Sequence, residues 1–162
     1  DIILFDAEDY GEPRDFEISE QGKTYYCLGS QHWAKNPHAT DFEYGILLDM
    51  VGAKNARFAK EQFSNRIAPN LVNKIWKLAQ DMGYSNYFAN TLGAPVTDDH
   101  IFVNQAGVPM IDIINQQPSG ETQFADYWHT HEDDMDVIDS RTLRAVGQVV
   151  LAVIYREASG VF

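Results

Sequence analysis

Apolar residues gather in three short runs along this chain, uninterrupted over residues 2–5 and 45–48, and with Asp112 as the one charged residue over 108–114. An uninterrupted run of this length is typical of a strand whose two faces are both covered in a largely parallel sheet. We therefore expect three buried strands, the third with Pro109 at its edge. Polar loops are expected over about 10–23 and 115–136, where no such pattern occurs.

Two longer segments carry apolar residues at helical spacing. Pro69 and Gly83 suit the first turn and the end of a helix over 69–82. Its apolar stripe consists of Leu71, Ile75, Leu78 and Met82. A last helix is expected from Asp139 or Ser140 onward. Its apolar face consists of Leu143, Val146, Val149, Val150, Val153 and Ile154. A shorter helix is expected within 25–34, before Asn-Pro-His at 36–38 stops it.

Buried strands that alternate with amphipathic helices predict an α/β fold, a three-layer sandwich with a mostly parallel central sheet. The chain has 162 residues, of which 44% are hydrophobic, enough for one sizeable core. We therefore expect a single α/β domain over residues 1–162. Because a protein seldom opens inside a central strand, the run at 2–5 indicates the C-terminal part of a larger domain.

The charge balance argues against several classes of partner. Asp and Glu number 24 against 12 Lys and Arg, a formal charge of −12. Such a chain lacks the basic stripe of a nucleic-acid binder, but it attracts metal ions and peptide amino groups. No apolar stretch of about 18 residues occurs, so no membrane span is expected. The single Cys27 forms no internal disulfide and leaves the redox compartment open.

Carboxylates follow the first two apolar runs. Glu8 and Asp9 come after the first run, Asp49 ends the second, and the loop that holds His129 follows the third. In open α/β sheets the ligand crevice lies beyond the carboxyl ends of the strands. A carboxylate at the edge of an apolar core needs a metal or another cation, unless it caps a helix or turn. The spacing alone leaves both interpretations open.

Four sequence blocks, in this order, resemble the glutaminyl cyclases. They are Asp-Ala-Glu-Asp at 6–9, Leu-Leu-Asp-Met-Val-Gly-Ala at 47–53, Asp-Asp-His-Ile at 98–101 with Gly-Val-Pro at 107–109, and Trp-His-Thr at 128–130. The segment Gly-Ser-Gln-His at 29–32 is also similar to a Gly-Ser-Arg-His segment of that family. These blocks reach from the start of the chain to its last helix. The wider family includes zinc aminopeptidases, so the resemblance implies a zinc-exopeptidase-like fold.

The resemblance implies catalytic and substrate-binding roles for four residues. Glu8 matches the catalytic acid/base, and Asp49 and Asp98 match members of a carboxylate network that holds a shared proton beside it. Trp128 matches part of the apolar wall around the substrate side chain, although an ordinary core aromatic is the alternative interpretation.

The resemblance also implies a zinc ion as cofactor. Asp9 stands where the family has a zinc-binding Glu, and an aspartate oxygen remains a ligand compatible with zinc. His129 matches the zinc-binding His, and the preceding Trp128 favours it over His131. The third ligand of the family belongs to a motif upstream of the first acidic block. The isolated chain is therefore expected to bind zinc weakly and to show little turnover.

The function implied is that of a glutaminyl-peptide cyclotransferase, which forms N-terminal pyroglutamate and releases ammonia. The alternative is a dinuclear zinc aminopeptidase, in which Asp49 is a ligand of the second zinc and Glu8 activates a water. Asp98 and Trp128 favour the cyclase, because aminopeptidases tend to carry a small residue in place of Asp98. A catalytically inactive binding domain of the same fold is a further alternative.

The resemblance implies peptide or protein substrates with a free N-terminus, and a secreted, periplasmic or cell-surface location. It leaves the oligomeric state open. Other patterns give weaker candidates. Ser30 lacks the second glycine of a nucleophile elbow. The acidic stretch lacks the glycine of a calcium loop and is typical of a solvated surface; it consists of Glu132, Asp133, Asp134, Asp136 and Asp139. The remaining histidines, His32, His38 and His100, are expected to be structural.

Overall fold

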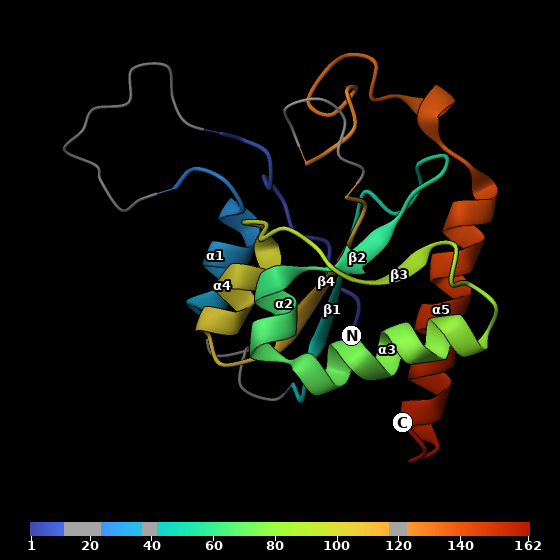
Figure 1. The fold of residues 1–162 in the computed structure, drawn as a ribbon. Helices are drawn as coiled ribbons and strands as arrows, with labels where there is room; N and C mark the ends of the chain where they lie inside the picture. The colour runs from blue at the N-terminus through green and yellow to red at the C-terminus, as the bar shows by residue number, and fades with distance from the viewer. Residues whose placement is uncertain (12–23, 37–41, 117–122) are drawn as a thin grey trace. The chain divides into compact units, whose positions relative to one another are not determined.

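The computed structural model describes residues 1–11, 24–36, 42–116 and 123–162 (Figure 1). The chain forms two compact units. The first contains Asp1–Leu47 and Val96–Met110, and the second contains Leu48–Pro95 and Ile111–Phe162. The expected loop over 10–23 and the stop at 36–38 fall largely outside the described residues, as does His38. The prediction of one domain over the whole chain stays a prediction.

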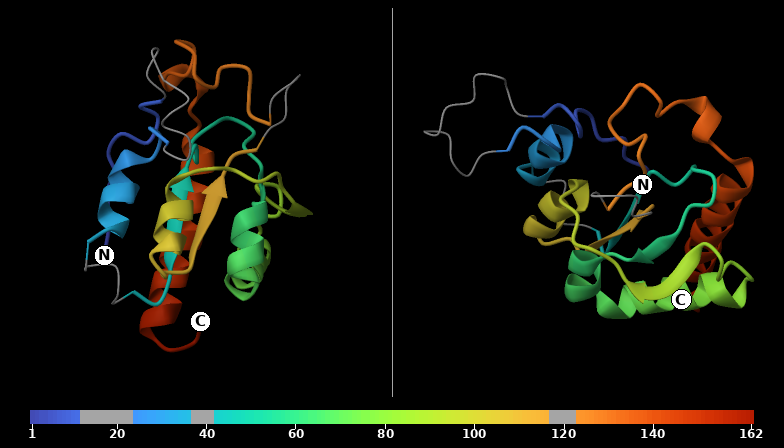
Figure 2. Two further views of the ribbon diagram at one scale, coloured as in Figure 1. Left: turned by 90° about the vertical axis from the view of Figure 1, so that its left-hand side faces the viewer. Right: turned by 45° about the horizontal axis from the view of Figure 1, so that its top comes forward.

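Two short helices form the framework of the first unit. α1 (Leu28–Ala34) and α4 (Asp99–Gln105) lie side by side in both figures of the fold (Figures 1 and 2). The buried core of this unit consists of Val103, Val108 and Met110, against which Phe5, Trp33, Phe42, Leu47 and Ala106 pack. The helix expected within 25–34 is confirmed. α4 was not predicted.

The prediction of a buried strand over residues 2–5 is wrong. No strand is assigned there, and Ile2 and Leu4 are 95% and 92% exposed. Phe5 is half-buried against the core of the first unit. A run of apolar residues becomes a buried strand only where neighbouring strands accept its hydrogen bonds and side chains cover both faces. Among the described residues, nothing covers the side of this run that Ile2 and Leu4 occupy.

In the described parts of the chain, four strands form two small sheets. β1 (Gly45–Asp49) and β4 (Met110–Ile114) are neighbours in one sheet. They confirm the strands expected at 45–48 and 108–114, the latter starting after Pro109. The expected burial is confirmed for β4 but is wrong for β1, where Leu48 is 43% exposed. β2 (Phe58–Lys60) and β3 (Phe88–Leu92) pair in parallel, with Phe58 opposite Phe88. Together with the helices, these strands confirm the predicted α/β class.

Among its described residues, the second unit has three α-helices: α2 (Gln62–Ile67), α3 (Pro69–Asp81) and α5 (Ser140–Ala158). α3 agrees with the predicted 69–82 to within one residue. Its buried face consists of Val72, Ile75, Trp76, Leu78 and Ala79. A 3₁₀ turn, η3 (Met135–Val137), precedes α5.

The predicted apolar face of α5 is partly wrong. Leu143 and Ile154 are 45% and 55% exposed. The residues that α5 buries are Thr142, Ala145, Val146, Val149 and Val153. This set has the spacing of three and four that keeps side chains on one side of a helix, and Leu143 and Ile154 lie beyond its edges. No helix in the described parts of the chain is both long and apolar enough to cross a membrane.

Candidate active site

Glu8, Cys27 and Asp98 come together in the first unit. Each offers one oxygen or sulfur atom, and these atoms lie within 4.8 Å of one another. Glu8 is half-buried, whereas Cys27 and Asp98 are buried. The Cys27 thiol lies 3.7 Å from Glu8 Oε1, at hydrogen-bonding distance for sulfur. The structure therefore places two of the predicted catalytic carboxylates side by side, next to a cysteine that the sequence did not single out.

The surroundings of this cluster disfavour negative charge on the thiol. Burial raises the pKa of Cys27 well above its usual range, and the charges of Asp99, Glu8 and Asp98 raise it further. The thiol therefore keeps its proton and acts as a hydrogen-bond donor. Burial also raises the pKa of Asp99. Carboxylates crowded in this way can share a proton, a property that suits a group that accepts and then donates one.

The first turn of α1 holds the backbone of the Glu8 segment. The amides of Cys27, Leu28 and Gly29 donate to the carbonyl oxygens of Glu8, Ala7 and Asp6, at 2.7, 3.0 and 2.9 Å. The first amides of a helix have no partner within the helix, so an adjacent loop is needed to accept their hydrogen bonds. The three parallel bonds fix residues 6–8 against α1.

Gly29 makes this close approach possible. A Cβ atom at position 29 would lie 2.5 Å from both the amide nitrogen and the carbonyl oxygen of Asp6. The neighbouring Ser30 is fully buried and donates its hydroxyl to the Cys27 carbonyl at 3.0 Å. Gly29 and Ser30 therefore have structural roles in docking α1, and the Ser30 side chain also interacts with the Asp99 carboxylate.

Asp98 combines its place beside Glu8 with a structural role. It is 2% exposed and caps the N-terminus of α4, where its Oδ1 accepts the Asp99 amide at 2.6 Å. The capping bond fixes the aspartate side chain near the start of the helix. The position of the Asp98 carboxylate is thus set by α4 itself.

Three other predicted site residues, Asp49, Trp128 and His129, lie in the second unit, and Asp9 lies in the first. Asp49 is the last residue of β1 and is half-buried. Trp128 stacks on the ring of His129, with centroids 3.9 Å apart and an interplanar angle of 19°. Phe124 packs against Trp128, with the two ring centroids 4.7 Å apart. The aromatic stack leaves the imidazole of His129 exposed.

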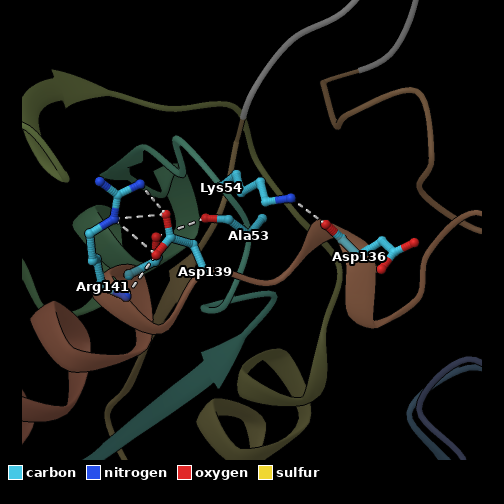
Figure 3. A network of polar contacts seen from close by, with 6 residues as sticks. Ala53, Lys54, Asp136, Asp139 and Arg141 are labelled. Atoms are coloured by element: carbon cyan, nitrogen blue, oxygen red, sulfur yellow. Dashed lines mark hydrogen bonds and ion pairs between the residues drawn. The ribbon is translucent and has the colours of Figure 1, made fainter.

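The segment after β1 is tied to the segment after the Trp-His pair (Figure 3). The Lys54 ammonium donates to the Asp136 carbonyl at 2.6 Å, and the Asp139 amide donates to the Gly52 carbonyl at 2.8 Å. The buried Thr142 hydroxyl donates to the Ala53 carbonyl at 2.8 Å. These bonds connect the turn that follows Asp49 to the C-terminal end of the loop that carries His129.

Left-handed backbone at residues other than glycine borders the predicted site residues. The φ angles are 52° at Ala7, 55° at Cys27, 48° at Met50 and 59° at His129, and Asn55, which does not neighbour a predicted site residue, has 58°. Each of the first four is a site residue or its direct neighbour, or contacts Glu8. Such conformations are sparsely populated by residues with a Cβ atom and occur preferentially at functional sites.

The acidic stretch from Glu132 to Asp139 is a surface feature. Residues 132–136 are exposed. Asp134 accepts the Asp136 amide at the start of η3, and Asp139 accepts the Arg141 amide at the start of α5. The two aspartates therefore cap helices, in agreement with the solvated surface expected from the sequence.

Asp9 and His129 fit the donor chemistry of a zinc site. Both side chains are exposed, one in each unit. A carboxylate oxygen and an imidazole nitrogen are ordinary ligands of zinc in enzymes. Asp9 is not a member of the group formed by Glu8, Cys27 and Asp98. The convergence of Asp9 and His129 on one ion stays a prediction, as does that of Asp49 with Glu8.

Comparison with known proteins gives a consistent result. The model of peptidase family M28 matches residues 1–154. A glutaminyl-peptide cyclotransferase of Boiga irregularis is 30% identical over 92% of this chain and 43% of its own length. The chain therefore spans less than half the length of that relative.

Two solved structures are more similar. A zinc-dependent exopeptidase of Parabacteroides distasonis has 52% identity and a TM-score of 0.85, over 94% of this chain and 52% of that protein. The glutaminyl cyclase of Tannerella forsythia has 47% identity and a TM-score of 0.85, over 94% and 53%. This chain belongs to peptidase family M28, an enzyme family in which its relatives include both glutaminyl cyclases and zinc exopeptidases.

Proposed function

We propose that the protein containing this chain is a zinc-dependent glutaminyl cyclase, which converts the N-terminal glutamine of peptides to pyroglutamate and releases ammonia. The observation that carries the proposal is the buried carboxylate of Asp98 beside Glu8. Cyclisation needs one group that takes a proton from the attacking amine and returns it to the leaving ammonia. A second carboxylate next to that group helps it to hold the proton between the two steps.

The reaction assigns each residue a task. The substrate α-amine attacks the side-chain amide carbon, a C–N bond forms, and Glu8 accepts the amine proton. The bond to the side-chain nitrogen then breaks, and Glu8 returns the proton so that ammonia leaves. Asp98 and Asp49 would stabilise the protonated form of Glu8, and Trp128 would form an apolar wall for the substrate side chain. Zinc, bound by Asp9, His129 and a third ligand elsewhere in the protein, would supply Lewis-acid polarisation of the amide carbonyl.

The similarity to a zinc-dependent exopeptidase favours a second candidate, a dinuclear zinc aminopeptidase. In that enzyme Glu8 would activate a water molecule for attack on the first peptide bond, and Asp49 would be a metal ligand. Both candidates use peptides or proteins with a free N-terminus as substrates. A catalytically inactive binding domain is the third candidate.

An assay of the complete protein on a peptide that begins with glutamine separates these candidates. Mass spectrometry of a cyclase reaction shows loss of ammonia from an otherwise intact peptide, whereas an aminopeptidase releases the first residue. A peptide that stays unchanged at saturating zinc supports the inactive domain. Glu8→Gln is expected to abolish turnover, and the exposed Glu43→Gln, in the same unit, is the matched control. Full activity of Glu8→Gln would refute the role of Glu8.

Metal analysis tests the ligand assignment separately from activity. After dialysis, the complete wild-type protein should retain stoichiometric zinc, and His129→Ala should lose it. His131→Ala is the matched control, because both histidines are exposed in the same loop. If His129→Ala retains zinc and His131→Ala loses it, His131 and not His129 is the zinc ligand.

We also propose that the protein acts outside the cytoplasm, as a secreted, periplasmic or cell-surface enzyme. This location suits an enzyme whose substrates are the N-termini of mature peptides. Fractionation of the producing cells, with activity measured in each fraction, tests the location. Activity confined to the cytoplasmic fraction would refute it.

A further inference from the structure

Cys27 contacts Glu8 through both its side chain and its backbone. Its thiol lies 3.7 Å from Glu8 Oε1, and its amide donates to the Glu8 carbonyl oxygen at 2.7 Å. The residue itself is completely buried. A buried cysteine usually behaves as a small apolar residue with a weak S–H donor. Here the sulfur faces the carboxylate to which the proposed function assigns the proton transfer.

The backbone of Cys27 is held in turn by α1. Ser30 donates its hydroxyl to the Cys27 carbonyl at 3.0 Å, and the Gln31 amide donates to the same oxygen at 3.0 Å. Cys27 also stands at the N-cap of α1 in the left-handed conformation, with φ at 55°. The sulfur is therefore attached to a backbone that has little freedom to move. A donor with a fixed position can restrict the rotamer of the carboxylate that accepts from it.

We propose that Cys27 is a positioning residue for Glu8, whose thiol donates a hydrogen bond to Oε1 and thereby holds the carboxylate in the orientation required for proton transfer. The inference rests on the proposed function, because it takes Glu8 as the acid/base. Burial among carboxylates keeps the thiol protonated, and so keeps it a donor. The task of Cys27 is to orient Glu8, and the sulfur takes no part in bond making.

Kinetics of three variants of the complete protein test the proposal. Cys27→Ala removes the donor and should lower kcat about threefold to tenfold at an unchanged KM, the range expected for loss of one hydrogen bond. Cys27→Ser keeps a donor and should stay within about twofold of the wild type. Val103→Ala, in the core of the same unit, is the stability control. It should lower the melting temperature at least as much as Cys27→Ala and leave kcat unchanged.

Three kinetic outcomes would overturn the proposal. One is a Cys27→Ala variant with the kcat of the wild type. A second is a Cys27→Ser variant that is folded at the assay temperature and yet has a kcat as low as that of Cys27→Ala. The serine hydroxyl should replace the thiol as hydrogen-bond donor, so such a result would contradict the role of the donor. A decrease of kcat in Val103→Ala equal to that in Cys27→Ala would assign the effect to stability and would also overturn it.

The infrared S–H stretching band gives a readout that does not depend on turnover. The band of Cys27 is identified by subtraction of the Cys27→Ser spectrum. Glu8→Gln should move it to higher frequency, because a neutral amide accepts a hydrogen bond less strongly than a carboxylate. A band unaffected by Glu8→Gln would refute the thiol–carboxylate bond. If the wild-type protein neither cyclises nor cleaves peptides while the band does shift, the proposed function fails and the hydrogen bond stands.

Discussion

Replacement of Gly29 by alanine places a methyl group where the backbone of Asp6 lies. The added Cβ atom would be 2.5 Å from the Asp6 amide nitrogen and carbonyl oxygen, and ordinary contact begins at 3.4 Å, so the two segments must separate by about 0.9 Å. The hydrogen bond from the Gly29 amide to the Asp6 carbonyl, now 2.9 Å, would lengthen to about 3.8 Å, beyond hydrogen-bonding distance. Overpacking of this kind costs about 1–3 kcal/mol.

Gly147→Ala is the matched control, because the same chemical change should have the opposite sign there. Gly147 lies inside α5, and an added Cβ atom meets nothing within 4 Å. Alanine in a helix interior is more stable than glycine by about 0.5–1 kcal/mol. Urea denaturation of the complete protein measures both free energies of unfolding. A Gly29→Ala variant as stable as the wild type would refute the docking of α1 on residues 6–8.

Two further predictions concern the start of α5. Thr142→Val should lower the free energy of unfolding by about 1 kcal/mol, because it removes the buried hydrogen bond to the Ala53 carbonyl. Thr142→Ser keeps the hydroxyl and should recover most of this loss in the same urea titration. A Thr142→Val variant as stable as the wild type would contradict the reasoning. The Arg141 side chain lowers the pKa of Asp139 from 3.8 to about 2. A carboxyl group with a lowered pKa stabilises the fold above pH 3.8, and this contribution disappears as the pH falls toward 2. The difference in melting temperature between the wild type and Asp139→Asn should therefore shrink over that interval, and a constant difference would contradict the prediction.

The elements that the sequence predicted correctly have strong local signals. α3 has proline at its first position and α5 has an aspartate cap, and β1 and β4 are mainly apolar. β2 is three residues long and β3 mixes apolar with polar residues, so neither shows a periodicity that could be recognised. The opposite error occurred at residues 2–5, where a strong apolar run has three exposed side chains.

The site was predictable in part. The resemblance to the cyclases predicts that Glu8 and Asp98 lie close together. Their spacing does not, because two residues so distant along the chain give no local signal of a contact. Cys27 gave no signal, because a single cysteine has no partner whose spacing could suggest a role. Its contact with Glu8 depends on the docking of α1 against residues 6–8, which only the folded chain reveals. The Gly-Ser pair at 29–30 is part of the resemblance, and the close approach of Gly29 to Asp6 is the physical reason for the glycine.

The left-handed alanine next to Glu8 has a consequence for attempts to make this protein more thermostable. Alanine at φ 52° is less favourable than glycine by about 1–2 kcal/mol, so Ala7→Gly offers local relief of backbone strain. The same change allows the backbone just before Glu8 to sample more conformations. The Glu8 carboxylate is then aligned with a substrate for a smaller fraction of the time. Heat resistance gained at Ala7 would thus reduce catalytic efficiency, whereas a helix position remote from the carboxylates, such as Gly147, offers stabilisation without that cost.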